Sequence, residues 1–343
     1  TALHPHSLAA NAKRQDGAPM SIIPVIDLSD SRGDAAIGAA IGRTCRETGF
    51  FLVTGHGADR DVVEAGWQAA RRFFDRPVEE KLSAAMPYPG YPYGYSPVKG
   101  ETLAASLGDA RPADLKETFS FGPSAFRRLD HKPADDAEAF VFSANPWPLG
   151  GDAFRLAVTA YWREMSALAG RIMRFFAIAL DLREDYFVRF VDAEASALRL
   201  LNYPDLAEPP LPGQLRAGEH SDYGSLTILR QEDSPGGLEV KGLDGAWHKV
   251  PALPDSFVIN IGDLMQRWTN DAWKSTLHRV AVPPSDRLGS ARRQSIAFFH
   301  QPNWDAEIAC IETCLAPGET PKYPPVGSGA YLASKFRSTV VKS

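Results

Sequence analysis

The sequence predicts an α+β protein in which a mainly helical N-terminal half packs against a β-rich C-terminal core. Apolar residues recur at helical spacing in the first half of the chain, whereas short apolar runs separated by Gly, Pro and Asp begin near Ser196. Many short strands with turn signals between them are typical of a sandwich or jelly roll. We expect four parts: an N-terminal arm over 1–20, a mainly helical region over 21–195, the β core over 196–305, and a C-terminal segment over 306–343 that packs on the core.

The first expected elements alternate between strand and helix. Residues 22–28 form an apolar run that predicts a strand, and Ser29-Asp30 after it can cap a helix over 34–47. Gly49 is expected to end that helix, and residues 50–53 read as a buried strand. Asp59 then begins a second helix that ends or kinks at Pro77.

A loop and a long helix are expected next. Residues 86–112 are rich in Pro, Gly and Tyr, which favours an irregular loop, either a lid over a functional site or a surface connection with aromatic residues packed beneath it. A helix from about 153 to 182 follows. We expect its apolar side to carry Leu156, Tyr161, Leu168, Ile172, Phe175 and Phe176.

The C-terminal half contains the runs that we expect to form the β core. They are residues 197–203, 226–229, 238–240, 247–250, 257–261, 278–282 and 295–300.

Composition excludes several classes of protein. The net charge of −5 and the pI near 5.9 give no basic stripe for binding phosphates, so nucleic acid is not an expected partner. No window is apolar enough to cross a bilayer, so no membrane association is expected. The three cysteines, Cys45, Cys310 and Cys314, are too few for a disulfide framework, which favours the cytoplasm. Cys310 and Cys314 also lack a second pair that would complete a tetrahedral metal site.

Three residues point to metal chemistry. His220 and Asp222 lie two apart, so on an extended segment their side chains share one face, and His278 lies in a second strand-like run. Two imidazoles and one carboxylate on one face of a divalent metal leave the other face open, as in non-heme Fe(II) oxygenases. The pair at 220 and 222 is a weak signal alone, and the third ligand gives it weight.

A second pair of residues suits an acidic cosubstrate. Arg293 and Ser295 are also two apart at the start of a predicted strand. A guanidinium binds a carboxylate through two parallel hydrogen bonds, and a hydroxyl adds a further donor. This pair therefore suits a dicarboxylate whose other end chelates the metal.

Together these motifs make the chain resemble the isopenicillin N synthase-like family of Fe(II)/2-oxoglutarate-dependent dioxygenases. The resemblance covers almost the whole chain. It is carried by residues 23–28, 49–57, 116–119, 145–148, 203–204, 220–227, 260–263, 275–280 and 293–295.

The resemblance implies a double-stranded β-helix core with N-terminal helices, and Fe(II) bound by His220, Asp222 and His278. It also implies that Arg293, Ser295 and Tyr203 bind 2-oxoglutarate, with O₂ as the second cosubstrate. Many relatives carry Asn two residues before that tyrosine, where this chain has Leu201, so we expect fewer cosubstrate contacts from this strand. The implied reaction hydroxylates, desaturates or cyclises a small organic molecule and releases succinate and CO₂.

The substrate is expected to be partly apolar, an amino-acid derivative or another natural-product scaffold. Two alternatives remain at this stage: an Fe(II) oxidase of the same fold that uses O₂ without 2-oxoglutarate, and a non-catalytic binding protein. The candidates for the substrate pocket are Tyr95, Phe119, Phe121, Trp268, Phe299 and Gln301.

Overall fold

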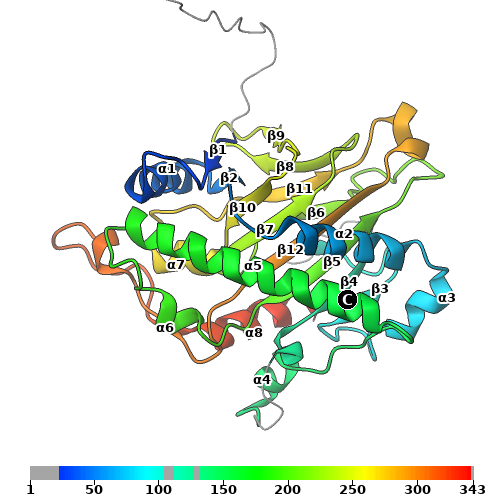
Figure 1. Cartoon of the computed structure of the whole chain (residues 1–343), viewed down its shortest axis with the longest axis horizontal. Helices are drawn as coiled ribbons and strands as arrows, with labels where there is room; N and C mark the ends of the chain where they lie inside the picture. The colour runs from blue at the N-terminus through cyan, green and yellow to red at the C-terminus, as the bar shows by residue number, and fades with distance from the viewer. Residues whose placement is uncertain (1–22, 104–111, 127–131, 341–343) are drawn as a thin grey trace, which may run out of the picture.

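A sheet of eight strands forms the centre of the computed structural model, which describes residues 23–103, 112–126 and 132–340 (Figure 1). The expected arm over 1–20 and part of the Pro/Tyr-rich loop lie outside the described residues. The strand order across the sheet is β1-β2-β10-β7-β12-β5-β4-β3, and only the β1–β2 pair is parallel. The strands are β1 Val25–Asp27, β2 Phe50–Thr54, β3 Gly94–Ser96, β4 Glu117–Phe121, β5 Ala197–Tyr203, β7 Leu226–Gln231, β10 Phe257–Ile261 and β12 Arg293–His300.

A second sheet of four strands faces the first, in the order β6-β11-β8-β9. Its strands are β6 Ala217–His220, β8 Gly237–Lys241, β9 Trp247–Lys249 and β11 His278–Ala281. A separate pair consists of β13 Glu307–Ile308 and β14 Val326–Gly327. Apolar side chains from both larger sheets, among them Leu52, Leu201, Leu238 and Val280, form one cluster between them.

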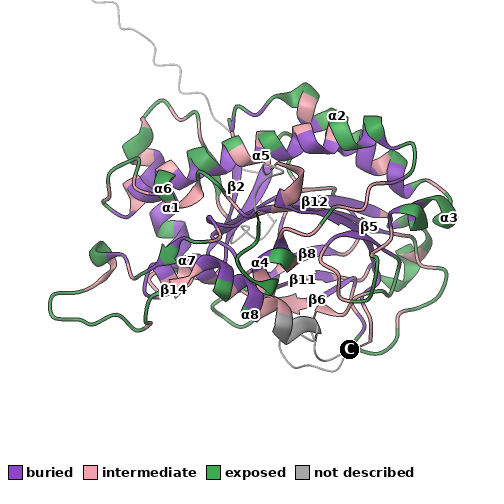
Figure 2. Ribbon diagram, turned by 90° about the horizontal axis from the view of Figure 1, so that it is seen from below, coloured by how far each residue is buried: buried purple, intermediate pink, exposed green. Residues whose placement is uncertain are grey.

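Helices cover the opposite face of the large sheet. The long helix α5 runs across this face and packs against α1 and α2, and Figure 2 shows α2 and α5 on one side of the large sheet and the small sheet on the other. The helices are α1 Asp34–Glu47, α2 Arg60–Phe74, α3 Val78–Lys81, α4 Asp136–Val141, α5 Asp152–Ala179, α6 Val188–Val191, α7 Asp263–Trp268 and α8 Ser328–Val340. Short 3₁₀ helices span Leu82–Ala84, Pro123–Ala125, Ser285–Ser290 and Glu312–Cys314.

The large sheet separates two environments because successive side chains of a strand point to opposite faces. On β5, Leu198 and Leu200 belong to the core beneath the helices. Leu201 and Tyr203 of the same strand belong to the cluster between the sheets. The same alternation continues in the neighbouring strands, so the sequence number of a residue decides which of the two environments its side chain enters.

Most predicted elements are confirmed, with several bounds matching to the residue, as for α1, β5 and β10. Asp59 caps α2 by accepting hydrogen bonds from the backbone of Asp61 and Val62. Two details are wrong. The cap of α1 is Gly33 rather than Ser29-Asp30, because Asp30 turns to pair with Arg32.

The predicted apolar side of α5 is also wrong at one position. Leu156 is 71% exposed, whereas Phe154 and Val158 on either side of it are buried. Burial along α5 follows the helical repeat through Phe154, Val158 and Trp162, and Leu156 falls on the opposite arc. The presence of an apolar residue in α5 is therefore not sufficient to assign that residue to the buried face of the helix.

Candidate metal and cosubstrate site

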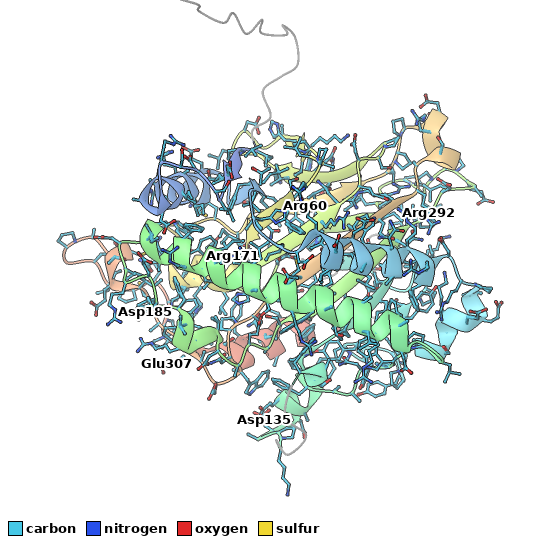
Figure 3. All side chains as sticks on the ribbon, viewed as in Figure 1. Arg60, Asp135, Arg171, Asp185, Arg292 and Glu307 are labelled. Carbon is cyan, nitrogen blue, oxygen red and sulfur yellow. The ribbon has the colours of Figure 1, made fainter. Side chains whose placement is uncertain are left out.

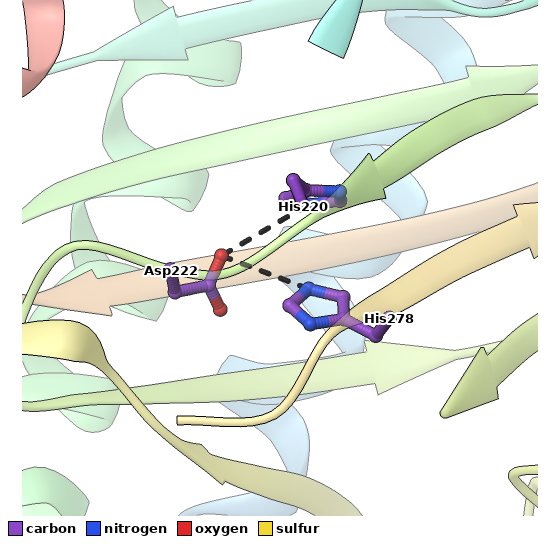
Figure 4. Close-up of side chains that lie close together, drawn as sticks. All are labelled: His220, Asp222 and His278. Carbon is purple, nitrogen blue, oxygen red and sulfur yellow. Dashed lines mark ion pairs between the residues drawn. The ribbon is translucent and has the colours of Figure 1, made fainter. Parts of the chain in front are cut away.

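The three predicted metal ligands lie together at the rim of the cavity between the two sheets. His220 is the last residue of β6, His278 is the first residue of β11, and the two are paired across the small sheet (Figure 4). The Nε2 atoms of His220 and His278 lie 4.0 Å and 3.7 Å from Oδ1 of Asp222. All three ligand atoms lie within 4.8 Å of one another, so one ion can bind all three.

One expectation from the sequence needs correction. The strand ends at His220, so Asp222 does not continue it as the second ligand of one extended segment. Ser221 and Asp222 belong to a turn that docks on β10 and α7, where the backbone N–H of Asp263 donates to the Asp222 carbonyl at 2.7 Å. Gly224 completes this docking, because a Cβ there would lie 2.3 Å from the His300 carbonyl oxygen.

Both imidazoles are oriented for metal binding by backbone carbonyls. Nδ1 of His220 lies 2.7 Å from the Gly218 carbonyl, and Nδ1 of His278 lies 3.1 Å from the Thr276 carbonyl. A carbonyl only accepts hydrogen bonds, so each Nδ1 carries the proton and each Nε2 presents a lone pair. Such support of the distal nitrogen is typical of histidines that bind metals.

Asp222 is held by two donors that sequence reasoning left without a role. Its Oδ2 accepts hydrogen bonds from Thr227 Oγ1 at 2.5 Å and from Asn260 Nδ2 at 2.7 Å. Oδ1, the oxygen facing the histidines, is left for a metal. The available signal was strand parity, since Thr227 and Asn260 both point to the cavity side of adjacent, paired strands.

The electrostatics of the triad favour the protonation states that a metal requires. Burial, and next the neighbouring His278, lower the pKa of His220, so this imidazole is neutral near pH 7. Burial alone would raise the pKa of Asp222, but the two histidines and the hydrogen bonds from Asn260 and Thr227 lower it below its usual value. Two imidazoles that present Nε2 lone pairs and one carboxylate match the donor set of a divalent metal.

The predicted cosubstrate residues meet at one end of the cavity. Arg293 and Tyr203 are direct neighbours across β12 and β5, and the guanidinium carbon lies 5.0 Å from the centre of the tyrosine ring. Arg293 Nη2 donates to Gln231 Oε1 at 2.7 Å. Its Nε and Nη1 are buried and have no hydrogen-bond partner among the described residues. Ser295 follows on the same face, and all three predicted residues line the cavity.

Unpartnered buried N–H groups of a guanidinium are costly, so an acidic ligand that accepted from both would be favourable at this position. Burial lowers the pKa of Arg293, with the Tyr203 hydroxyl opposing that shift. A carboxylate bound at Nε and Nη1 would satisfy both donors. The residues of this pocket therefore fit one carboxylate of 2-oxoglutarate.

Arg216 is a second buried guanidinium that sequence reasoning missed. Its Nη2 donates to the carbonyls of Ala291 and Pro204 at 2.7 and 3.2 Å. Burial, and next the positive charge of Arg293, lower the pKa of Arg216 to about 10. Two like charges this close to each other make the region favourable for an anion.

The cavity itself measures about 200 Å³ and contains the triad and the cosubstrate residues. Two of the six predicted pocket residues, Phe299 and Gln301, line it. The structure places the side chains of Tyr95, Phe119, Phe121 and Trp268 in the core beneath the helices instead. In β4, Phe119 and Phe121 are paired with Leu200 and Leu198 and share their face, while Ser120 points into the cavity.

The other two side chains have separate reasons for their positions. Tyr95 is paired with Phe119 and donates to Glu117 Oε2 at 2.5 Å on the helix side of the sheet. Trp268 lies on α7 and packs edge to face against Phe187 and Phe190, at 5.0 Å between ring centres. Residues from the 86–112 loop still reach the cavity, because Pro92, Tyr93 and Leu103 line it.

Features elsewhere in the described part of the chain show no competing site of this kind. The triad is the one cluster there of three or more His, Cys, Asp or Glu side chains spaced for a single ion. Cys45, Cys310 and Cys314 are free thiols. Charged side chains such as Arg60, Arg171 and Asp185 project from the outer surface (Figure 3).

Comparison with known proteins agrees with this geometry. Residues 23–149 match the family described as "non-haem dioxygenase in morphine synthesis N-terminal", and residues 195–302 match the "2OG-Fe(II) oxygenase superfamily". A 2-oxoglutarate-Fe(II) type oxidoreductase, hxnY, of Emericella nidulans is 30% identical over 93% of this chain and 92% of its own length. A homoarginine-6-hydroxylase of Oryza sativa subsp. japonica is 32% identical over 95% of this chain and 99% of its own.

A solved structure shares the fold. A Neurospora crassa protein, crystallised in complex with alpha-KG and thymine, superposes with a TM-score of 0.78 at 34% identity, covering 92% of this chain and 97% of its own. The chain belongs to the 2-oxoglutarate-Fe(II) oxygenase superfamily, in its isopenicillin N synthase-like branch. The predicted α+β fold with a jelly-roll core is confirmed.

Membership also defines the reaction class. The protein is an Fe(II)- and 2-oxoglutarate-dependent dioxygenase that oxidises a small organic molecule, with O₂ as cosubstrate. The alternative of an oxidase that works without 2-oxoglutarate is not favoured, because one relative is named a 2-oxoglutarate-Fe(II) type oxidoreductase and a solved relative was crystallised in complex with alpha-KG. No helix in the described part of the chain has the length and apolarity to span a bilayer.

Proposed function

We propose that His220, Asp222 and His278 bind Fe(II), and that Arg293, Ser295 and Tyr203 bind the carboxylate of 2-oxoglutarate that lies farther from the metal. The observation that carries this proposal is the pair of unpartnered buried N–H groups on Arg293, in the same cavity as the triad. When bound, Fe(II) supplies the activation of O₂ and the oxidative decarboxylation of 2-oxoglutarate.

The protein's own residues bind and orient the reactants. The carbonyls of Gly218 and Thr276 fix both imidazoles, and Thr227 and Asn260 fix the carboxylate of Asp222. Gln231 holds Nη2 of Arg293, which leaves Nε and Nη1 to receive the cosubstrate carboxylate. The rest of the cavity wall is mostly apolar, which favours a site with little water and so limits side reactions.

We propose that the substrate enters the part of the cavity walled by Phe299, Tyr223, Leu332 and Phe336, and that it is hydroxylated. The cavity of about 200 Å³ limits it to a small molecule. The relatives named above include a homoarginine hydroxylase and a protein crystallised with thymine, so both compounds are first candidates.

The same proposal assigns tasks along the chain. Residues 196–305 form the catalytic core, 21–195 provide the helical support and part of the cavity wall, and 306–343 close the cavity through α8. The N-terminal arm over 1–20 has no assigned task. Three free thiols support the cytoplasm as its compartment.

Two measurements test the proposal. Anaerobically purified protein with Fe(II) and ascorbate should bind 2-oxoglutarate in a calorimetric titration and, on admission of O₂, form succinate with thymine or homoarginine. His220→Ala should lose Fe(II) binding and turnover, and Arg293→Met should lose cosubstrate binding while keeping Fe(II). Arg292→Met is the matched control, because Arg292 pairs with Asp75 outside the cavity. Its loss should change neither the affinity for Fe(II) nor the affinity for 2-oxoglutarate.

Retained turnover in His220→Ala would refute the ligand assignment. Unchanged 2-oxoglutarate affinity in Arg293→Met would refute the cosubstrate assignment. Oxidation of a substrate by the wild type without succinate formation would contradict the reaction itself.

A further inference from the structure

One charged side chain in the cavity has no task in the chemistry described so far. Apart from Asp222, the two histidines and Arg293, the charged side chain among the described cavity-lining residues is Arg199. It lies on β5, four residues before Tyr203 and on the same face of the strand. At about 3.3 Å per residue, Arg199 is about 13 Å along the strand from the cosubstrate tyrosine. Arg199 is paired with Ala297, two residues before Phe299 on the same face of β12, which places it beside the substrate part of the cavity.

The guanidinium of Arg199 is held in place by two hydrogen bonds, and one of its nitrogen atoms is left without a partner among the described residues. Nε donates to Ser120 Oγ at 3.0 Å, and Nη1 donates to Glu101 Oε2 at 3.2 Å. Nη2 makes no hydrogen bond to the described residues. Because the side chain is 24% exposed and lines the cavity, Nη2 is available as a donor to a bound molecule.

The charge of Arg199 is already balanced by its neighbours. Glu101 also lies 3.7 Å from the ammonium of Lys116, and Lys116 in turn pairs with Asp114 at 2.5 Å. Lys116 and Asp114 are buried, and Asp114 Oδ1 accepts a hydrogen bond from the backbone of Gly218 at 3.0 Å. The cluster thus contains two cations and two anions in alternation, anchored to the strand that carries His220.

A neutral cluster with one spare donor selects for an uncharged acceptor. A carbonyl oxygen can accept from Nη2 without disturbing the ion pairs. A carboxylate in the same place would meet the like charge of Glu101 and would lack a cation of its own. Burying such an unmatched charge is costly, so the balance of charges disfavours acidic substrates.

We propose that Arg199 is a specificity-determining residue that donates a hydrogen bond to the carbonyl oxygen of an uncharged substrate, with Glu101 holding the guanidinium and rejecting carboxylates. The inference rests on the proposed function, because it requires the substrate to occupy this cavity. It narrows the substrate of that function to small amides, lactams or related uncharged carbonyl compounds, and it therefore favours thymine over homoarginine, which carries a carboxylate.

Matched probes test the charge argument directly. Benzamide and benzoate have the same ring and differ in the charge of one group, as do cyclohexanecarboxamide and cyclohexanecarboxylate. Each is titrated calorimetrically into the full chain loaded anaerobically with Fe(II) and 2-oxoglutarate. We expect the wild type to bind the amides at least about tenfold more tightly than the acids, because each acid would place its charge against that of Glu101 without a cation of its own.

Three variants locate the effect. Arg199→Met should weaken amide binding by about 10- to 100-fold while 2-oxoglutarate affinity stays unchanged. Glu101→Gln should shift the amide-to-acid ratio by at least about tenfold toward the acids, and it decides the question if Arg199→Met fails to fold. Arg230→Met is the matched control, because Arg230 is 25% exposed and also pairs with a glutamate, Glu64, on the opposite face of the sheet.

The outcomes separate this inference from the proposed function. Failure of the wild type to bind 2-oxoglutarate would overturn the proposed function. With 2-oxoglutarate bound, any of four results would overturn the role of Arg199 alone: wild-type preference for the acids, no binding of either amide, unchanged amide affinity in Arg199→Met, or an unchanged ratio in Glu101→Gln.

Discussion

Asn260 provides the sharpest test of how the protein orients Asp222, the proposed carboxylate ligand of the metal. The carboxylate of Asp222 is buried, and its Oδ2 depends on two donors, Asn260 Nδ2 at 2.7 Å and Thr227 Oγ1 at 2.5 Å. Asn260→Ala removes the first donor and leaves Thr227 as the remaining support. We therefore expect Asp222 to be less well oriented toward His220 and His278, and Fe(II) to bind more weakly.

The magnitude follows from the type of hydrogen bond. A hydrogen bond to a charged group contributes about 1.5–3 kcal/mol. Loss of such support for a metal ligand typically weakens metal binding by about 10- to 100-fold. Since each tenfold change is about 1.4 kcal/mol, the two ranges agree. We expect the dissociation constant for Fe(II) to rise by about 10- to 100-fold in Asn260→Ala.

The assay is an anaerobic calorimetric titration of the wild type and of the variant with Fe(II). Asn145→Ala is the control, because Asn145 also donates from its amide, to Ser124 Oγ at 2.9 Å and to the Gly122 carbonyl at 3.3 Å, away from the metal site. The control should lose stability without losing Fe(II) affinity. Equal Fe(II) affinity in wild type and Asn260→Ala, with both proteins folded, would refute the idea that this hydrogen bond orients the ligand.

Three further predictions concern the cosubstrate, the metal and pH. Gln231→Leu should raise the KM for 2-oxoglutarate by about tenfold with Fe(II) affinity unchanged, because Arg293 Nη2 loses its acceptor; an unchanged KM would contradict this. Fe(II) at a hundredfold excess over its dissociation constant should stabilise the anaerobic protein by about 2.7 kcal/mol, visible as a higher Tm that EDTA reverses; no shift would contradict metal binding. Burial lowers the pKa of His300 in the folded protein below the usual 6.5. As the pH falls, this histidine therefore takes up a proton more readily in the unfolded protein than in the folded protein, and the free energy of unfolding should decrease below about pH 6.5. Urea unfolding between pH 7.5 and 5 should show a smaller decrease in the free energy of unfolding for His300→Asn than for the wild type. An equal pH dependence in both proteins would contradict the assignment to His300.

Local sequence patterns were sufficient to predict the helices and strands whose bounds are set by the residues within them and next to them. The helix over 34–47 ends where Gly49 adopts a φ of +64°, a conformation that favours glycine, and the strand over 197–203 shows the alternation of a two-faced strand. The three proposed metal ligands and the Arg293–Ser295 pair could be selected from the sequence because their residue types and spacing suit the chemistry proposed for them. Their supports were not, since Asn260 and Gln231 reach the site only through strand pairing that one sequence does not reveal.

The substrate pocket was harder to predict for a related physical reason. An aromatic residue near the site in sequence can point to either face of its strand, and the face depends on register with its neighbours. Phe119 and Phe121 point toward the helices because they pair with Leu200 and Leu198. Ser120, between them, points into the cavity and holds Arg199. Hydrophobicity therefore suggested the wrong members of β4, and the polar residue between them is the one that lines the cavity.

The dependence on register also gives a reason why Arg293, the residue proposed to bind the cosubstrate, lies on β12. A slip of one residue would turn Arg293 and Ser295 from the cavity to the helix side and bring Gln294 and Ile296 inward. β12 is paired on both sides, with β5 from Arg293 to Phe299 and with β7 from Ser295 to His300. Such a slip would break the hydrogen bonds of β12 to both β5 and β7. It would also bring polar side chains into the buried core beneath α5. A strand in the middle of the sheet thus gives Arg293 a fixed direction that a loop or an edge strand would not.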